Sequence, residues 1–96
     1  MIIELKKFGK TLTSRDSGSE AYRAIQSLLQ GLNKEEDIVL DFEGLDTFSP
    51  SWGDEFIVSV IKNYKNKVIL VNTQNRSVIA TLDLLTDING IEFNVR

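Results

Sequence analysis

Two short apolar runs separated by a stretch of helical periodicity restrict the possible folds of this chain more than any other feature. The runs occupy residues 38–40 and 68–71 and contain only Val, Ile and Leu. Such runs are typical of strands buried on both faces of a sheet. Between them, apolar residues repeat at helical spacing, which predicts a helix with one buried stripe: Gly53, Phe56, Ile57, Val60, Ile61 and Tyr64. A helix between two buried strands implies a right-handed crossover and a largely parallel inner sheet.

Two further helices are predicted, one on each side of this unit. The first begins after Ser17, which has the spacing of a capping box with Glu20, and it ends near Gly31. The other begins near Asn75 and ends at Gly90. Helical spacing predicts their inward-facing residues: Ala21, Ala24, Ile25, Leu28, Leu29 and Leu32 in the first, and Val78, Ile79, Leu82 and Leu85 in the other.

The remaining segments predict short outer strands. Residues 2–8 indicate a first strand that ends at Gly9, and residues 10–14 are compatible with a short second one. At the other end of the chain, Ile91, Phe93 and Val95 alternate with polar residues, which is typical of a half-exposed edge strand. Ninety-six residues have room for one core. We therefore expect a single α/β domain over residues 1–96, with a four- to five-stranded mixed sheet and three helices.

The composition argues against several classes of function. The chain has no Cys and no His, so it lacks a thiolate nucleophile, the usual general base and the usual zinc ligand. Its net charge is −3 and its basic residues are scattered, whereas nucleic-acid binding requires clustered Lys and Arg. No apolar run has the length of a membrane span or a signal segment. We expect a cytoplasmic binding protein without catalytic activity, cofactor, metal ion, nucleic-acid partner or membrane association.

The segment that follows the first apolar run carries the most informative motifs, because partners of parallel sheets gather at the carboxyl ends of the strands. Residues 38–56 read Ile-Val-Leu-Asp-Phe-Glu-Gly-Leu-Asp-Thr-Phe-Ser-Pro-Ser-Trp-Gly-Asp-Glu-Phe. The Leu-Asp-Phe strand end, the Gly-Leu step, the Phe-Ser turn and the Asp-Glu-Phe helix start resemble the STAS-like domain family of unknown function. Gly9 with Thr13-Ser14-Arg15, and Val71-Asn72, resemble further parts of its pattern. This family is distantly similar to the STAS domains of anti-sigma-factor antagonists.

The resemblance implies a protein-interaction module with a regulatory role. In the antagonist relatives, a partner kinase with the histidine-kinase ATPase fold phosphorylates a serine at the start of this same helix and thereby releases the partner. The relatives' Asp-Ser-Ser-Gly step falls on Ser49-Pro50-Ser51-Trp52, so Ser51 would occupy the phosphorylated position, with Ser49 as a second candidate. The implied partner is a kinase or an anti-sigma-like protein of that ATPase fold. The partner-binding residues would be Ser49, Pro50, Ser51, Trp52, Asp54 and Glu55.

The residues at this helix start have structural interpretations as well. Ser49 as an N-cap with Pro50 at the first helical position would stabilise the helix without any switch. Trp52 lies off the centre of the buried stripe, so we expect it to be partly exposed, either at an interface or flat over the sheet edge. Gly53 predicts a close approach of the helix to the sheet.

One basic residue lies at the junction before the first helix. Arg15, which follows Ser14, could bind an anion in the loop or pair with Asp41 across it. Asp41 itself is expected to accept hydrogen bonds from loop amides. Solvation or a purely structural pair is the alternative for Arg15.

Two other functions remain open on the sequence. Acidic residues gather around one loop (Asp41, Glu43, Asp46, Asp54 and Glu55), and such a group could make a small phosphoacceptor or Mg²⁺-dependent enzyme. Val58 and Leu84 fall outside their helical stripes, so each is either a scattered surface apolar residue or part of a partner or dimer patch. A structural subunit could self-associate through Leu84 or through the C-terminal edge strand. The sequence does not determine the oligomeric state.

Overall fold

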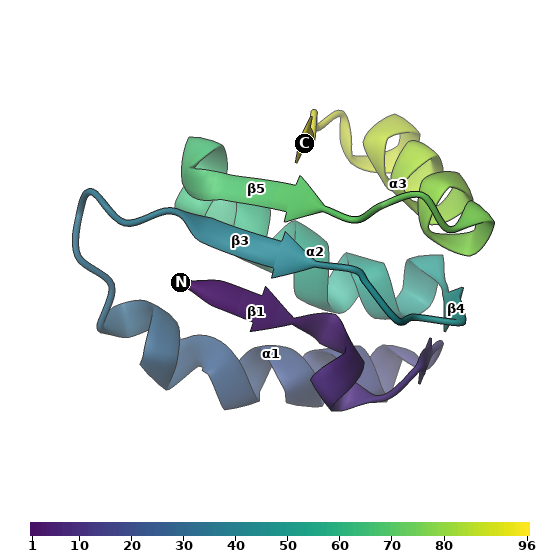
Figure 1. Cartoon of the computed structure of the whole chain (residues 1–96), viewed down its shortest axis with the longest axis horizontal. Coiled ribbons are helices and arrows are strands. Elements are labelled where there is room, and N and C mark those ends of the chain that lie inside the picture. Colours follow the sequence, from purple (N-terminus) through teal and green to yellow (C-terminus); the bar gives the residue numbers. More distant parts are fainter.

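The computed structural model describes residues 1–96 as a sheet with three helices (Figure 1). The main sheet contains β1 (Ile2–Glu4), β3 (Ile38–Asp41), β5 (Val68–Val71) and β6 (Asn94–Val95), in the order β1-β3-β5-β6. Every pair in it is parallel. The α/β class and the three helices are therefore confirmed. The expected mixed sheet of four to five strands is instead a parallel sheet of four strands beside a separate sheet of two.

The mixed sheet is absent because the chain leaves the sheet after β1. Residues Leu5–Phe8 form a 3₁₀ helix, η1, in place of the second half of the predicted first strand. The next strand, β2 (Thr11–Leu12), then pairs with β4 (Thr47–Phe48), and this second small sheet is also parallel. Each main strand is followed by a helical connection that returns the chain to the same end, so neighbouring strands run in the same direction.

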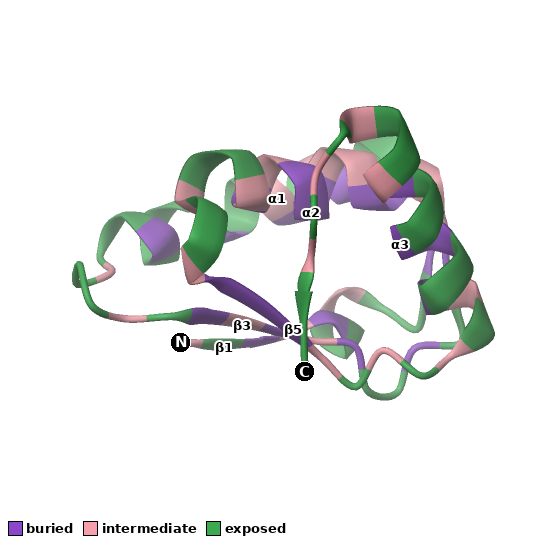
Figure 2. Ribbon diagram, turned by 90° about the horizontal axis from the view of Figure 1, so that it is seen from above, coloured by how far each residue is buried: buried purple, intermediate pink, exposed green.

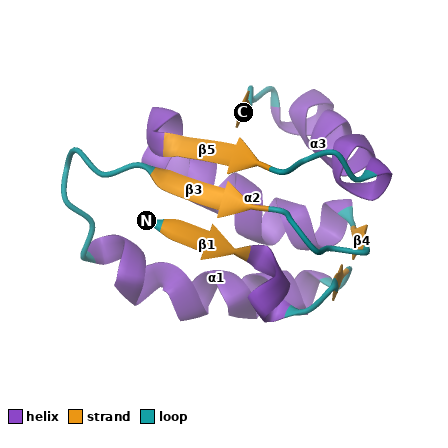
Figure 3. Ribbon diagram, viewed as in Figure 1, coloured by secondary structure: helices purple, strands orange, loops and turns teal.

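The three helices are α1 (Arg15–Gln30), α2 (Pro50–Tyr64) and α3 (Arg76–Asn89), and all three lie on one face of the sheet (Figures 2 and 3). Strand order follows chain order without reversal, and right-handed crossovers that all step in one direction place their helices on one side. In β5, Val68, Ile69 and Leu70 are all buried, so the expected burial on both faces is confirmed there. The same expectation is wrong for β3. Ile38 and Leu40 are fully buried under the helices, whereas Val39 and Asp41 are half-buried on the other face.

Helix α2 is the central helix, because it packs against α1 on one side and α3 on the other (Figure 1). Its buried residues consequently extend beyond the single stripe that its periodicity predicts. Val58, which falls outside that stripe, is buried. On α3 the reverse occurs, since Ile79 was expected to face inward and is 47 % exposed.

Local capping agrees with the sequence at both ends of α3. Asn75 is the N-cap of α3 and accepts hydrogen bonds from the backbone N–H groups of Ser77 and Val78. Gly90 ends α3 at a φ of 63°, a conformation that glycine adopts at low cost. Helix α1 differs, because its N-cap is Ser14, whose hydroxyl accepts from the Ser17 N–H. The predicted capping box on Ser17 is therefore wrong.

The C-terminal strand is confirmed at the sheet edge but is shorter than predicted, since β6 contains only two residues. Between α2 and β5, residues Lys65–Lys67 form a second 3₁₀ helix, η2. None of the helices combines the length and the apolar character that crossing a bilayer requires.

Candidate functional site

The starts of α1 and α2 lie side by side because the two strands that precede them are paired. Leu12 of β2 is opposite Phe48 of β4, and each strand ends one or two residues before the N-cap of its helix. Two positive helix ends are therefore held next to each other at the carboxyl end of the sheet. We call the exposed or half-buried residues around them the helix-start surface: Ser14, Arg15, Ser51, Asp54 and Glu55.

The two candidate serines differ in their contacts. Ser49 is the N-cap of α2 with Pro50 behind it, as predicted, but its side chain does not cap the helix. Its hydroxyl donates to the Thr13 carbonyl at 2.8 Å, and its N–H donates to the Leu12 carbonyl at 3.0 Å. Ser51 is half-buried at the second position of α2, and its side chain makes no hydrogen bond within the protein. Of the two candidates, Ser51 is therefore the one whose hydroxyl is free.

The expectation that Trp52 is partly exposed is wrong, because its side chain is 0 % exposed. It stacks on Phe56 with ring centroids 4.7 Å apart and meets the Phe48 ring edge-on at 5.9 Å. Its indole N–H donates to the Ser17 hydroxyl at 3.3 Å. Trp52 lies off the stripe of α2 that faces the sheet, but it faces α1 instead. The neighbouring helix therefore covers it. It holds the two helices together and is not available to a partner.

Two glycines allow this close packing. A Cβ on Gly18 of α1 would lie 2.7 Å from the Trp52 carbonyl oxygen and 3.0 Å from its Cα. The predicted packing role of Gly53 is confirmed, although its close neighbours are the side chains of Leu85 on α3 and Phe48 on β4, at 2.8 and 3.0 Å. Helix α2 is thus in close contact with α1 through Gly18 and with α3 through Gly53.

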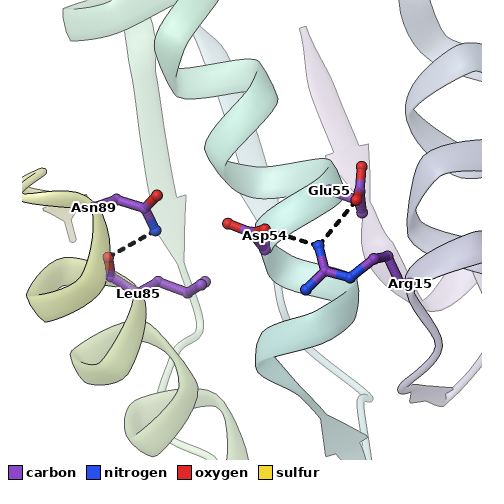
Figure 4. A network of polar contacts seen from close by, with 5 residues as sticks. All are labelled: Arg15, Asp54, Glu55, Leu85 and Asn89. Carbon is purple, nitrogen blue, oxygen red and sulfur yellow. Dashed lines mark hydrogen bonds and ion pairs between the residues drawn. The ribbon is translucent and has the colours of Figure 1, made fainter.

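Arg15 joins the two helix starts by an ion pair that crosses from α1 to α2 (Figure 4). Its Nη1 donates to Asp54 Oδ2 at 2.8 Å and to Glu55 Oε1 at 2.9 Å. These hydrogen bonds, first that to Asp54 and then that to Glu55, raise the pKa of the Arg15 guanidinium above its ordinary value. Arg15 remains 53 % exposed and charged, so it offsets one of the two carboxylates on the helix-start surface.

Asp41 is not part of this surface, so the predicted Arg15–Asp41 pair is wrong. Its Oδ1 accepts from the Glu43 N–H at 3.0 Å and from the Asn72 side-chain amide at 2.8 Å. The expected hydrogen bonds to loop amides are therefore present at the end of β3. The five acidic residues around this loop do not converge, since no three of the chain's carboxylates are close enough to hold a metal ion.

The start of α3 fixes the chain just before Ser49. The Phe48 carbonyl accepts from the Ser77 and Thr81 hydroxyls at 3.0 and 2.6 Å, and the Phe48 N–H donates back to Ser77 at 2.9 Å. The Asn75 amide donates to the Leu45 carbonyl at 2.9 Å. These residues position β4 from the side opposite α1, so the start of α2 is held by both neighbouring helices.

Sequence reasoning did not predict the supporting roles of four residues: Ser17, Gly18, Ser77 and Thr81. The sequence does contain a signal for Gly18, because it lies in a Ser-Gly-Ser sequence inside a helix. Glycine disfavours helix formation relative to alanine, so a glycine there indicates a close contact. No comparable signal marks Ser77 or Thr81, since serine and threonine near a helix start are common and their partner is a distant carbonyl.

Asn75→Ala is expected to lower the free energy of unfolding by about 1–2 kcal/mol, because it removes the N-cap of α3 and the contact with the Leu45 carbonyl. Urea denaturation followed by circular dichroism measures the change. The neighbouring Gln74, which is exposed, provides the control substitution Gln74→Ala. A loss no larger than that of the control would contradict the anchoring role of Asn75.

The fold and the site define a class of protein. It is a parallel α/β domain that has its helices on one face of the sheet and a free serine at the start of the central helix. The sequence pattern of the family described as a STAS-like domain of unknown function matches residues 24–78. This chain belongs to that family, so the predicted resemblance is confirmed. The match includes Ser49 to Glu55 but not Ser14, Arg15 or Gly18. No curated protein and no solved structure matches the chain.

Proposed function

We propose that this protein is a regulatory interaction module rather than an enzyme, and that its partner contacts the helix-start surface. Membership of a STAS-like family supports the proposal, as does the absence of His and Cys from the chain. The partner class that we propose is a kinase or an anti-sigma-like protein of the histidine-kinase ATPase fold. Trp52 is not part of the contact, since it is buried between α1 and α2.

The single observation that carries the proposal is the free hydroxyl of Ser51. The Ser49 hydroxyl donates to the Thr13 carbonyl, whereas Ser51 is half-buried and makes no hydrogen bond within the protein. Ser51 lies three and four residues before Asp54 and Glu55, so these side chains are neighbours on one helix face. Arg15 contacts both of these carboxylates.

Phosphorylation of Ser51 would change the charge of this surface. The unmodified group of Arg15, Asp54 and Glu55 sums to −1, and a phosphoryl group adds about −1.5 to −2. The positive end of α2 and the guanidinium of Arg15 favour the phosphate, whereas the two carboxylates repel it. The net effect is a strongly anionic surface, which a partner that docks on the unmodified surface would no longer fit.

Mass spectrometry after co-expression with the proteins encoded beside this one is the experiment that tests the proposal. We expect phosphate on Ser51 and loss of the modification in Ser51→Ala. The exposed Ser27 on α1 provides the matched control, because Ser27→Ala should leave the modification unchanged. The purified phosphoprotein should bind the same partner about tenfold more weakly or worse, since like charges in an interface are costly.

Two results would contradict the proposal. Modification that persists in Ser51→Ala would place the switch elsewhere. A complex that survives both phosphorylation and Arg15→Gln unchanged would show that the partner contacts a different surface.

A further inference from the structure

A groove lies at the opposite end of α2 from the helix-start surface. It has a volume of about 550 Å³ and is enclosed by the last turns of α2, the start of β5 and the chain that leads into β6. Four of its residues are apolar, namely Ile61, Val68, Ile91 and Phe93. Val68 is buried and the other three are half-buried, so the apolar lining extends from the core to the surface. The volume is within the range of small-molecule sites.

The polar rim of the groove is mainly cationic. Lys62 and Lys65 are both exposed, and neither forms an ion pair. The only carboxylate in the lining is that of Glu92, which is exposed and also unpaired. The rim therefore carries a net charge of +1 in a chain whose overall charge is −3. This local sign favours an anion at the mouth of the groove.

The backbone at Lys65 makes this lysine distinctive. Lys65 is the C-cap of α2 and has a φ of 47° and a ψ of −119°, a positive-φ conformation that favours glycine. Helix α3 ends on Gly90 at a similar φ of 63°. The helix dipole favours a lysine near a helix C-terminus. It does not explain why the lysine is at a position where its backbone is strained.

We propose that this groove binds a small amphiphilic anion, a molecule with an apolar chain and a single carboxylate or phosphate. The apolar chain lies against Ile61, Val68 and Phe93, and the anionic group contacts Lys62 and Lys65 at the mouth. The site is separate from the helix-start surface, and it does not depend on the proposed regulatory function.

Isothermal titration of the full chain with straight-chain alkanoates, from hexanoate to decanoate below their micellar concentrations, tests the proposal. Burial of the apolar chain should tighten binding by about fourfold for each added methylene. The trimethylammonium cation with the decyl chain has the same tail and the opposite charge, so it should bind at least about tenfold more weakly than decanoate. Equal binding of both head groups, or no binding of decanoate, would overturn the proposal.

Charge variants at the rim locate the site. Lys65→Gln should weaken decanoate binding about two- to fivefold, as expected for one exposed ionic contact, and Glu92→Gln should strengthen it. The exposed Lys34, which lies outside the groove, provides the control Lys34→Gln. Lys65→Gly should raise the thermal midpoint by relieving the backbone and should still weaken binding. Unchanged binding in both Lys65 variants would exclude this groove as the site.

Discussion

Replacement of Trp52 by alanine is expected to lower the free energy of unfolding by about 3–5 kcal/mol, because it creates a large cavity between α1 and α2. The side chain is fully buried, stacks on Phe56 and donates to Ser17. A domain of this size has little stability to spare, so Trp52→Ala should be close to unfolded at moderate temperature. Urea denaturation must be followed by far-UV circular dichroism, since Trp52 is the only tryptophan.

Two further variants provide a scale for the loss in Trp52→Ala. Trp52→Phe retains an aromatic ring in the stack and should cost less than Trp52→Ala. Leu28→Ala is the exposed control on α1, because Leu28 is 58 % exposed and its truncation should change the stability little. A loss for Trp52→Ala as small as that for Leu28→Ala would show that Trp52 is solvent-exposed, as its helical position alone suggests.

The second large effect is expected at Gly18, where alanine should destabilise the protein by about 1–3 kcal/mol. On helix propensity alone the same change would stabilise α1 by about 1 kcal/mol. The sign is reversed because the new methyl group would lie 2.7 Å from the Trp52 carbonyl oxygen, and α2 backbone cannot rotate away as a side chain can. Thermal and urea unfolding both measure the loss.

The other glycines of the helices provide matched controls for Gly18. Gly31→Ala should be neutral or slightly stabilising, because its Cβ meets only the Leu28 carbonyl at 3.6 Å and its φ is −83°. Gly53→Ala should fall between the two, since it meets the side-chain ends of Leu85 and Phe48. Stabilisation by Gly18→Ala would mean that α1 and α2 are further apart than described.

The helices were predictable because their signals are local. Each helix buries residues at a spacing that follows from its own geometry, and Pro50, Asn75 and Gly90 act on backbone groups within a few residues. The start of α1 was not predictable in the same way. Ser14 and Ser17 both satisfy the local rule for an N-cap, and the pairing of β2 with β4 places Ser14 at that position.

The candidate site was predictable only in part. Ser51, Asp54 and Glu55 were expected from the resemblance, and they lie at the surface. The partner of Arg15 did not follow, because its carboxylates are 39 and 40 residues away in the chain. The burial of Trp52 did not follow either, since a helical wheel describes one buried face and α2 has neighbours on both sides as well as the sheet below.

The sequence by itself determined the three helices and the two central strands, β3 and β5, because apolar periodicity and capping residues act over a few positions. It also determined that the apolar runs form parallel strands, since a helix separates them. Only the tertiary structure decided that all three helices lie on one face of the sheet, and that Trp52 is therefore enclosed while Ser51 is free. These properties depend on which elements become neighbours, and that is settled by crossover direction and by close contacts such as that of Gly18 with α2.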